Sequence, residues 1–185
     1  ALRDSEARYR RLFDANPHPM WVYDLGTLRF LAVNDAAISH YGYSREEFLD
    51  MTVADICPSE DIPALLENVS NVSFSIDEAG EWRHRKKDNT VIHVEITTHT
   101  LTFAGRKAEL VLAHDITKRK ESEKRQALHA RVLSILNRPN EWAELHRDLL
   151  HEIKEFSAMD AVGIRLRQCE DYPYYVQDGF SEDFI

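Results

Sequence analysis

The sequence is poor in cysteine and in glycine. Its 185 residues include only Cys57 and Cys169, which lie far apart and lack the spacing of metal-ligand pairs. Two distant cysteines exclude a disulfide framework and are typical of a reducing compartment. The six glycines do not cluster, so the chain has no phosphate-binding loop, nucleophile elbow or kinase signature. We therefore predict neither a catalytic site nor a metal site in this chain.

Basic residues are outnumbered, and long apolar runs are absent. The 23 basic and 32 acidic residues give a formal net charge of -9, which argues against nucleic-acid binding. No apolar run is long enough to cross a bilayer, and residues 1–6 lack the apolar core of a signal peptide. We expect a cytoplasmic location and no membrane contact by this chain. The 43% of hydrophobic residues are enough for one packed domain with a remainder.

The first 70 residues alternate between short strands and short helices. Residues 5–15 have the pattern of an amphipathic helix that Pro17 ends. Strands are predicted over residues 20–24 and 30–33, around a turn that contains Gly26. Residues 35–41 favour a helix stopped by Gly42, and Ser44 with Glu47 forms the capping box of another. Asp61 is the expected cap of a third helix.

Three antiparallel strands are expected after residue 80, over residues 81–87, 91–103 and 108–116. Asp88 and Asn89 suit the first turn, since both tolerate left-handed backbone. In the middle strand the apolar parity changes after Ile96, which predicts a bulge within residues 97–100. Two strands, several short helices and three strands indicate an α+β fold. We expect a five-stranded antiparallel sheet with short helices on one face.

The junction of Asp115, Ile116 and Thr117 joins the last strand to a helical pattern. Residues 118–137 contain no glycine or proline and are rich in helix formers. The Thr117 hydroxyl is a candidate N-cap. A strand joined to a helix without slack can move that helix as a lever, so these three residues are the predicted signal relay.

The connecting helix, residues 118–139, offers a short apolar seam. Leu128, Val132 and Ile135 are spaced by four and three residues, as in a coiled coil. We expect a parallel helix pair and hence a homodimer. The alternative is a solvated linker, because barely more than one heptad is present.

The sequence resembles a PAS sensor domain over roughly residues 5–120. We place the domain itself at residues 16–117 and take residues 1–15 as a flanking N-terminal helix. The motifs that carry the resemblance are Tyr9-Arg10-Arg11-Leu12-Phe13 with Asn16-Pro17, Val33-Asn34 with Ala36, Gly42-Tyr43-Ser44-Arg45-Glu46-Glu47-Phe48, Pro58-Ser59-Glu60-Asp61, Arg85-Lys86-Lys87-Asp88 and Asp115-Ile116-Thr117. The resemblance implies a cavity between the sheet and the short helices that takes a small ligand. Its candidate lining residues are Phe30, Tyr41, Phe48, Trp82 and Ile96.

The identity of a ligand or cofactor stays unknown at this stage. Haem needs an axial histidine, and residues 62–78 contain none. The sequence around Cys57 does not match the Asn-Cys-Arg-Phe type of helix that flavin photosensors of the related class carry. A small buried thiol is the preferred role of Cys57, and a redox role would require an exposed thiolate.

Residues 140–185 resemble the start of a GAF domain. The resemblance runs from a helix with Leu145, Leu149, Ile153 and Phe156 as its apolar stripe, through residues 162–166, to Gly179-Phe180. A segment this short cannot close a core by itself. His151-Glu152-Ile153-Lys154 also resembles the box that carries the phosphoacceptor histidine of sensor kinases, but the Thr-Pro that ends this box is missing.

Three functions follow from these observations. The first is a sensory PAS module of a signal-transduction protein such as a sensor histidine kinase, whose output domain belongs to the same parent chain. The second is a dimerisation scaffold that binds no ligand. The third is a phosphoacceptor region at His151. This function is disfavoured, because His151 lies off the apolar stripe of its helix and is expected to be an ordinary solvated side chain.

Overall fold

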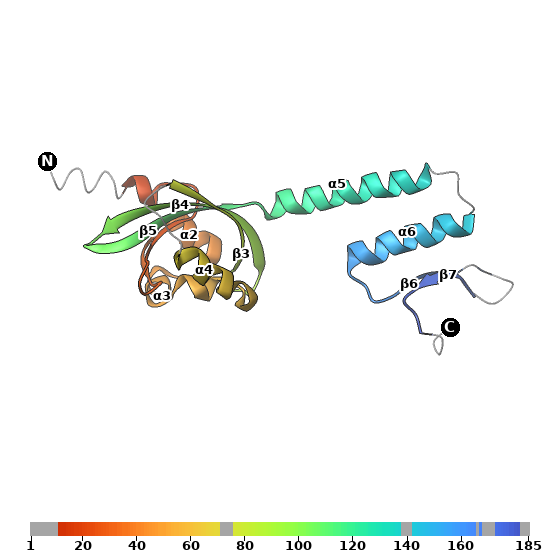
Figure 1. Cartoon of the computed structure of the whole chain (residues 1–185), viewed down its shortest axis with the longest axis horizontal. Coiled ribbons are helices and arrows are strands. Elements are labelled where there is room, and N and C mark those ends of the chain that lie inside the picture. Colours follow the sequence, from red (N-terminus) through yellow and green to blue (C-terminus); the bar gives the residue numbers. More distant parts are fainter. Residues whose placement is uncertain (1–10, 71–75, 138–141, 166, 168–172, 182–185) are drawn as a thin grey trace. The chain divides into compact units, whose positions relative to one another are not determined.

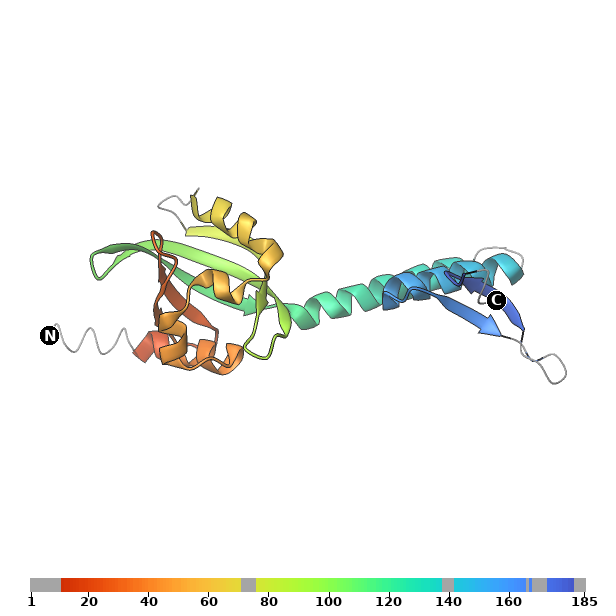
Figure 2. The ribbon, with the colours of Figure 1, turned by 90° about the horizontal axis from the view of Figure 1, so that it is seen from below.

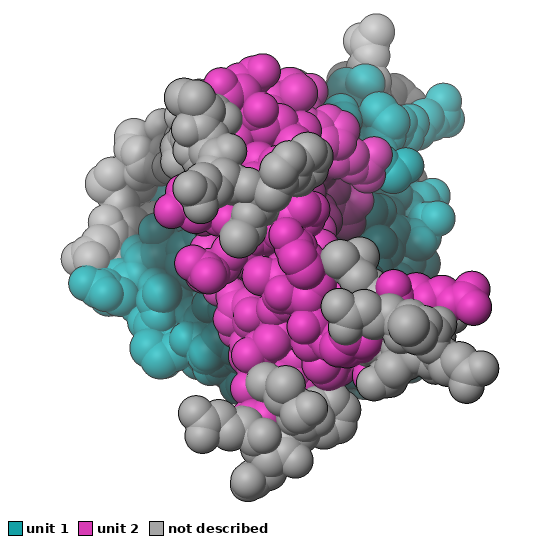
Figure 3. Space-filling model, turned by 90° about the vertical axis from the view of Figure 1, so that its right-hand side faces the viewer, with its two compact units in different colours: residues 1–120 teal, residues 121–185 magenta. Residues whose placement is uncertain are grey.

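The computed structural model describes residues 11–70, 76–137, 142–165, 167 and 173–181. The chain divides into two compact units, residues 1–120 and residues 121–185 (Figure 3). Within the described ranges, no helix combines the length and the apolar character that a membrane crossing requires. Of the expected helix at residues 5–15, residues 11–15 fall within the description; residues 11–14 are helical and Ala15 lies in a turn.

One five-stranded antiparallel sheet forms the first unit. Its strands are β1 (Met20–Asp24), β2 (Phe30–Val33), β3 (Ile76–Arg85), β4 (Val91–Phe103) and β5 (Arg106–Asp115). They lie in the order β2-β1-β5-β4-β3, so that β5 is the middle strand, between β1 and β4. The expected α+β fold with a five-stranded antiparallel sheet is confirmed.

Short helices fill the chain between β2 and β3 and lie over one face of the sheet (Figures 1 and 2). They are α2 (Asp35–Tyr41), α3 (Arg45–Asp50), the 3₁₀ helices Val53–Ile56 and Ser59–Asp61, and α4 (Ile62–Ser70). The capping box of Ser44 and Glu47 is present, and Gly42 ends α2 with a φ of 83°. The expected cap at Asp61 is wrong: Asp61 precedes α4, but its carboxylate accepts two hydrogen bonds from the Arg83 guanidinium.

The expected bulge in β4 is wrong. β4 pairs with β5 in continuous register from Val94 to Phe103. Thr98 and Thr100 continue the buried face that Ile92, Val94 and Ile96 form. Polar side chains therefore occupy inward positions where the parity argument required apolar ones. The irregularity lies instead in β3, between Glu78 and Gly80.

The turns explain why the strands pair where they do. Asn89 has a φ of 67°, which confirms the left-handed backbone expected at the turn between β3 and β4. Ala104 and Gly105 form a two-residue turn between β4 and β5 with φ values of 48° and 78°. Two successive positive φ angles match the right-handed twist of paired strands. β5 therefore begins at Arg106, two residues before the predicted strand.

The long helix α5 (Thr117–Leu136) follows β5, and α6 (Trp142–Ser157), β6 (Val162–Arg165) and β7 (Tyr174–Asp178) complete the chain. β6 and β7 pair antiparallel. Leu150 is the buried side chain of α6, whereas Ile153 and Phe156 of the predicted stripe are about half exposed. In α5, Ile135 is already buried within a single chain.

Candidate functional site

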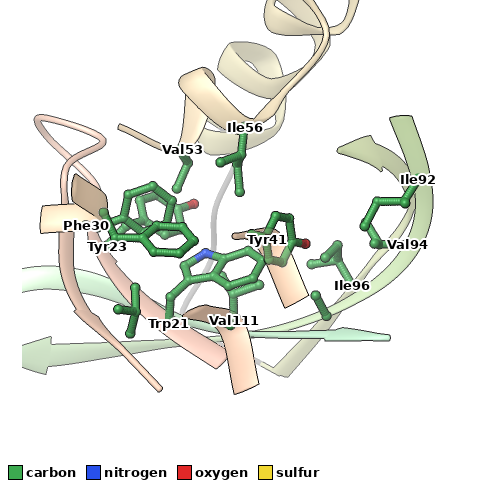
Figure 4. Close-up of a cluster of buried hydrophobic side chains, with 14 residues drawn as sticks. Trp21, Tyr23, Phe30, Tyr41, Val53, Ile56, Ile92, Val94, Ile96 and Val111 are labelled. Carbon is green, nitrogen blue, oxygen red and sulfur yellow. The ribbon is translucent and has the colours of Figure 1, made fainter. Parts of the chain in front are cut away.

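The core of the first unit is an aromatic cluster between the sheet and the short helices (Figure 4). The Trp21 ring of β1 lies at its centre, 6.1 Å from the Phe30 ring and 5.7 Å from the Tyr41 ring. The Phe30 and Phe48 rings are 5.1 Å apart in an edge-to-face arrangement. Such pairs add about 0.5–1.5 kcal/mol each beyond the area that they bury, so this end of the layer is tightly packed.

A cavity of about 40 Å³ borders this cluster. Its walls come from β1, the first 3₁₀ helix, α4, β3, β4 and β5. The lining residues are Trp21, Tyr23, Val53, Ile56, Cys57, Leu65, Asn68, Trp82, His84, Ile96, Thr98, Glu109 and Val111.

The five predicted pocket residues fall into two groups. Trp82 and Ile96 line the cavity. Phe30, Tyr41 and Phe48 belong to the adjacent core cluster and are buried, but they do not line the cavity. All five therefore belong to the core cluster or pack against it, but only two of them line the cavity.

Several polar groups of the cavity escaped sequence reasoning. The Trp21 side chain is 2% exposed, and its Nε1–H has no hydrogen-bond partner in the described structure. The Tyr23 hydroxyl donates to the buried Glu109 carboxylate, and the Tyr41 hydroxyl lies 2.7 Å from Nδ1 of His84. An unpaired buried donor costs about 1–3 kcal/mol, so the Trp21 N–H is a position where an acceptor would be stabilised.

Burial sets the protonation of these groups. It lowers the pKa of His84 to about 3, so the imidazole is neutral at ordinary pH. Burial, and then the negative charge of Glu109, raises the pKa of Tyr23. Burial also raises the pKa of the Cys57 thiol to about 11. Cys57 is therefore a buried, protonated thiol without the thiolate character that redox sensing needs.

The junction between β5 and α5 is fixed to β4. The backbone N–H of Ile116 donates to the carbonyl of His93, and the N–H of His93 donates to Oγ1 of Thr117 at 2.9 Å. Oδ1 of Asp115 accepts from the N–H of Thr117 at 2.9 Å. The predicted N-cap is wrong, because the Thr117 hydroxyl is engaged by β4 and the first helical bond runs from Lys120 to the Ile116 carbonyl.

Charged groups surround this junction. Nε2 of His40 in α2 lies 3.1 Å from Oδ2 of Asp115. Burial raises the pKa of Asp115, but hydrogen bonds from Thr117 and the nearby His40 outweigh it and hold the pKa below its ordinary value. At the first turn of α5, Arg119 pairs with Glu95 of β4, and Lys120 pairs with Glu81 of β3. Exposed ion pairs of this kind contribute little stability but tie the helix start to two strands.

The cavity does not fit a haem or a flavin in its present shape. A cavity of roughly 150 Å³ is what a single benzene ring occupies in a protein core, and this one has about 40 Å³. α4 carries no histidine toward it. Across the described ranges, no group of three or more His, Cys, Asp or Glu side chains is arranged to hold a metal ion.

His151 lies on α6 and is exposed, with Nδ1 3.2 Å from Oδ2 of Asp178. Lys154 pairs with the same carboxylate at 2.9 Å. The chain continues from α6 into β6 and β7. The segment His151-Glu152-Ile153-Lys154 is therefore followed in the chain by a two-stranded sheet.

Two curated proteins are similar in sequence to this chain. The methyl sulfide methyltransferase-associated sensor of Methanosarcina acetivorans is 30% identical over 162 residues, which cover 88% of this chain and 16% of that protein. Protein CrtJ of Rhodobacter capsulatus is 32% identical over 75 residues, which cover 40% of this chain and 16% of that protein. The chain thus matches a small part of each relative's length.

Solved structures share the fold of the first unit. The PAS domain of an HTR-like protein from Haloarcula marismortui superimposes with a TM-score of 0.56 at 21% identity, covering 62% of this chain and 94% of that chain. A domain of a sensory box sensor histidine kinase/response regulator from Geobacter sulfurreducens gives 0.52 at 23% identity, with 62% and 97% covered. The PAS domain sequence profile matches residues 17–118. With its five-stranded sheet, its layer of short helices and the cavity between them, this chain belongs to the PAS domain family.

Proposed function

We propose that this PAS domain is the sensory module of a multidomain signal-transduction protein, such as a sensor histidine kinase. It binds a small ligand or a partner at the cavity and relays occupancy through Asp115, Ile116 and Thr117 to α5. The name of one relative, a methyltransferase-associated sensor, and the sensor kinase that contains a similar domain both support this function.

The continuity of β5 with α5 carries the proposal. β5 contributes Glu109 and Val111 to the cavity wall, and six residues after Glu109 the same strand reaches the junction. β4 contributes Ile96 and Thr98 to the same wall, and its His93 holds Ile116 and Thr117. A ligand that changes the spacing of β4 and β5 therefore acts on both anchors of α5. Only a ligand with different affinity for two strand arrangements can shift the helix.

The organisation of the chain is part of the proposal. We place the PAS domain at residues 16–117, the signalling helix at 118–139 and the beginning of a GAF-like domain at 140–185. The division into compact units near residue 120 supports the first boundary. We further propose a homodimer formed through α5 with Leu128 and Val132 in its seam, because these two side chains are half-buried rather than fully buried in one chain.

A second function is favoured by the size of the cavity. At about 40 Å³ it holds few atoms, which is the arrangement that a scaffold without ligand would have. In that case the domain dimerises constitutively and α5 serves as a fixed spacer. A phosphoacceptor role of His151 has weaker support, since its imidazole pairs with Asp178 next to β7.

Native mass spectrometry of the freshly purified chain, together with its absorption spectrum, tests the sensory function. We expect a dimer that retains a small molecule at the level of one per protomer, and loss of that molecule on mild unfolding. An empty dimer would contradict ligand sensing and favour the scaffold. Labelling of His151 by a partner kinase domain, absent from a His151→Gln control, would instead support the phosphoacceptor.

A further inference from the structure

The wall of the cavity carries two N–H groups that can donate a hydrogen bond to a ligand. The first is Nε1–H of Trp21, which is buried and unpartnered in the described structure. In Figure 4 the indole nitrogen lies on the edge of the ring that faces Val53 and Ile56, both of which line the cavity. A buried indole N–H ordinarily finds an acceptor, so its orientation toward the cavity points to one that occupies it.

The second donor is Nε2 of His84. The Tyr41 hydroxyl is buried, and its one partner in the described structure is Nδ1 of His84 at 2.7 Å. Tyr41 keeps its proton, because burial raises its pKa, and that proton requires an acceptor. Nδ1 therefore accepts, and in neutral imidazole the proton then resides on Nε2. The Trp21 and His84 rings lie 5.8 Å apart, although β5 and β4 separate their strands, β1 and β3, in the sheet.

Charge narrows the ligand further. Glu109 also lines the cavity. Its side chain is buried, with 4% of the residue exposed, and it accepts a hydrogen bond from the Tyr23 hydroxyl. A carboxylate in a low-dielectric wall repels an anionic ligand strongly. A cation has nothing to gain from the two N–H donors. The rest of the wall is largely apolar, including Val53, Ile56, Leu65 and Val111, although Asn68 and Thr98 also line it.

We infer that the cavity takes a small, neutral molecule with one hydrogen-bond-accepting atom and an otherwise apolar surface, bound through Trp21 and His84. This inference rests on the proposed sensory function and specifies its ligand class. About 40 Å³ is available. Since a water-sized atom needs about 10–15 Å³, the ligand has about three or four non-hydrogen atoms.

Three planar probes of equal size test this assignment: acetone, acetate and isobutene. Acetone is neutral with an acceptor, acetate adds a charge, and isobutene lacks the acceptor. Titration into the full 185-residue chain is followed by the indole N–H resonances of Trp21, Trp82 and Trp142 in two-dimensional NMR. We expect acetone to shift the Trp21 resonance downfield with a dissociation constant about tenfold lower than that of isobutene or acetate.

Matched variants separate the donor from the cavity. Trp21→Phe removes the N–H while keeping an aromatic ring, and it is expected to bring acetone to within about twofold of isobutene. Trp82→Phe alters the same cavity without touching the unpartnered donor, so the preference for acetone is expected to persist. Dispersed amide spectra confirm that each variant is folded.

The inference is overturned if isobutene or acetate binds as well as acetone, or if Trp21→Phe keeps the preference. It is also overturned if acetone leaves the Trp21 resonance unmoved, which would show a cavity filled by ordered water only. None of these results contradicts the proposed sensory function. A chain that purifies with an anionic or wholly apolar ligand would retain that function and contradict the inference alone.

Discussion

Replacing Asn34 by Ala is expected to lower the free energy of unfolding of the PAS domain by about 3 kcal/mol. The Asn34 side chain is fully buried. Its Oδ1 accepts from the N–H groups of Met20 and Ala37 at 2.9 Å, and its Nδ2 donates to the carbonyl of His18 at 2.9 Å. One side chain thus caps α2, anchors the start of β1 and holds the preceding segment. Chemical denaturation followed by tryptophan fluorescence measures the loss.

Two comparisons make the Asn34 prediction specific. Asn34→Asp keeps the acceptor for Met20 and Ala37 but sets an oxygen against the His18 carbonyl and places an ionisable carboxyl group at a buried position, so it should also destabilise the domain. Gln126→Ala removes an exposed amide side chain from α5 and should change stability by less than about 0.5 kcal/mol. A loss below about 1 kcal/mol for Asn34→Ala would show that the buried hydrogen bonds are replaced by other contacts.

The second large effect is a loss of stability in mild acid caused by His84. Its pKa is lowered to about 3 in the folded chain, whereas an unfolded histidine titrates near 6.5. As the pH falls below about 6.5, the unfolded chain binds a proton that the folded chain cannot. Stability is therefore complete above this pH and declines below it. Between pH 6.5 and pH 5 this group alone should remove about 2 kcal/mol.

His84→Gln isolates that contribution. Glutamine provides a carbonyl acceptor for the Tyr41 hydroxyl and does not titrate. The variant's unfolding free energy, subtracted from that of the unaltered chain at each pH, cancels the carboxylates and the other histidines. We expect the difference to shift by about 2 kcal/mol in favour of the variant between pH 6.5 and pH 5. Parallel stability curves would contradict a neutral, buried His84.

Elements with local signals could be predicted from the sequence. Ser44 and Glu47 bond within one helical turn, and Gly42 and Asn89 adopt positive φ because their residue types tolerate it. The bounds of β1, β2 and α2 follow from similar short-range patterns. These features depend on neighbours within about four residues, which a single sequence displays.

The cavity could not be predicted in the same way, because it depends on partners far apart in the chain. Tyr23 and Glu109 are 86 residues apart, and Tyr41 and His84 are 43 apart. Residues 20–23 are apolar at both parities, so the alternation does not show that Trp21 faces inward. The predicted bulge in β4 was wrong because Thr98 is buried at an inward position where the periodicity required an apolar side chain.

The relay joint was recognisable in position but not in mechanism. The change from an apolar run to a charged helix predicts a strand and a helix in contact at Asp115 to Thr117. The Thr117 hydroxyl accepts from the N–H of His93 in β4 and does not cap the helix. This contact could not be predicted, because His93 lies 24 residues earlier in the chain. The consequence is a joint held by three hydrogen bonds to β4 and to itself, in place of a simple cap.

The central claim is that this joint couples α5 to the sheet. Electron–electron distance measurement between spin labels at Thr102→Cys in β4 and Ser122→Cys in α5 tests it directly, with Cys169 replaced by Ser and the buried Cys57 retained. Dilution with unlabelled chain removes distances between protomers. The control is Lys118→Ala, which changes an exposed side chain in the same helical turn as Thr117.

The unaltered chain and the Lys118→Ala control should give one narrow distance distribution. Asp115→Ala combined with Thr117→Ala removes the hydrogen bonds to the Thr117 N–H and from the His93 N–H, and it should broaden that distribution about twofold or more, since the helix then starts without its anchors. An unchanged mean and width in the double variant would contradict transmission through this joint.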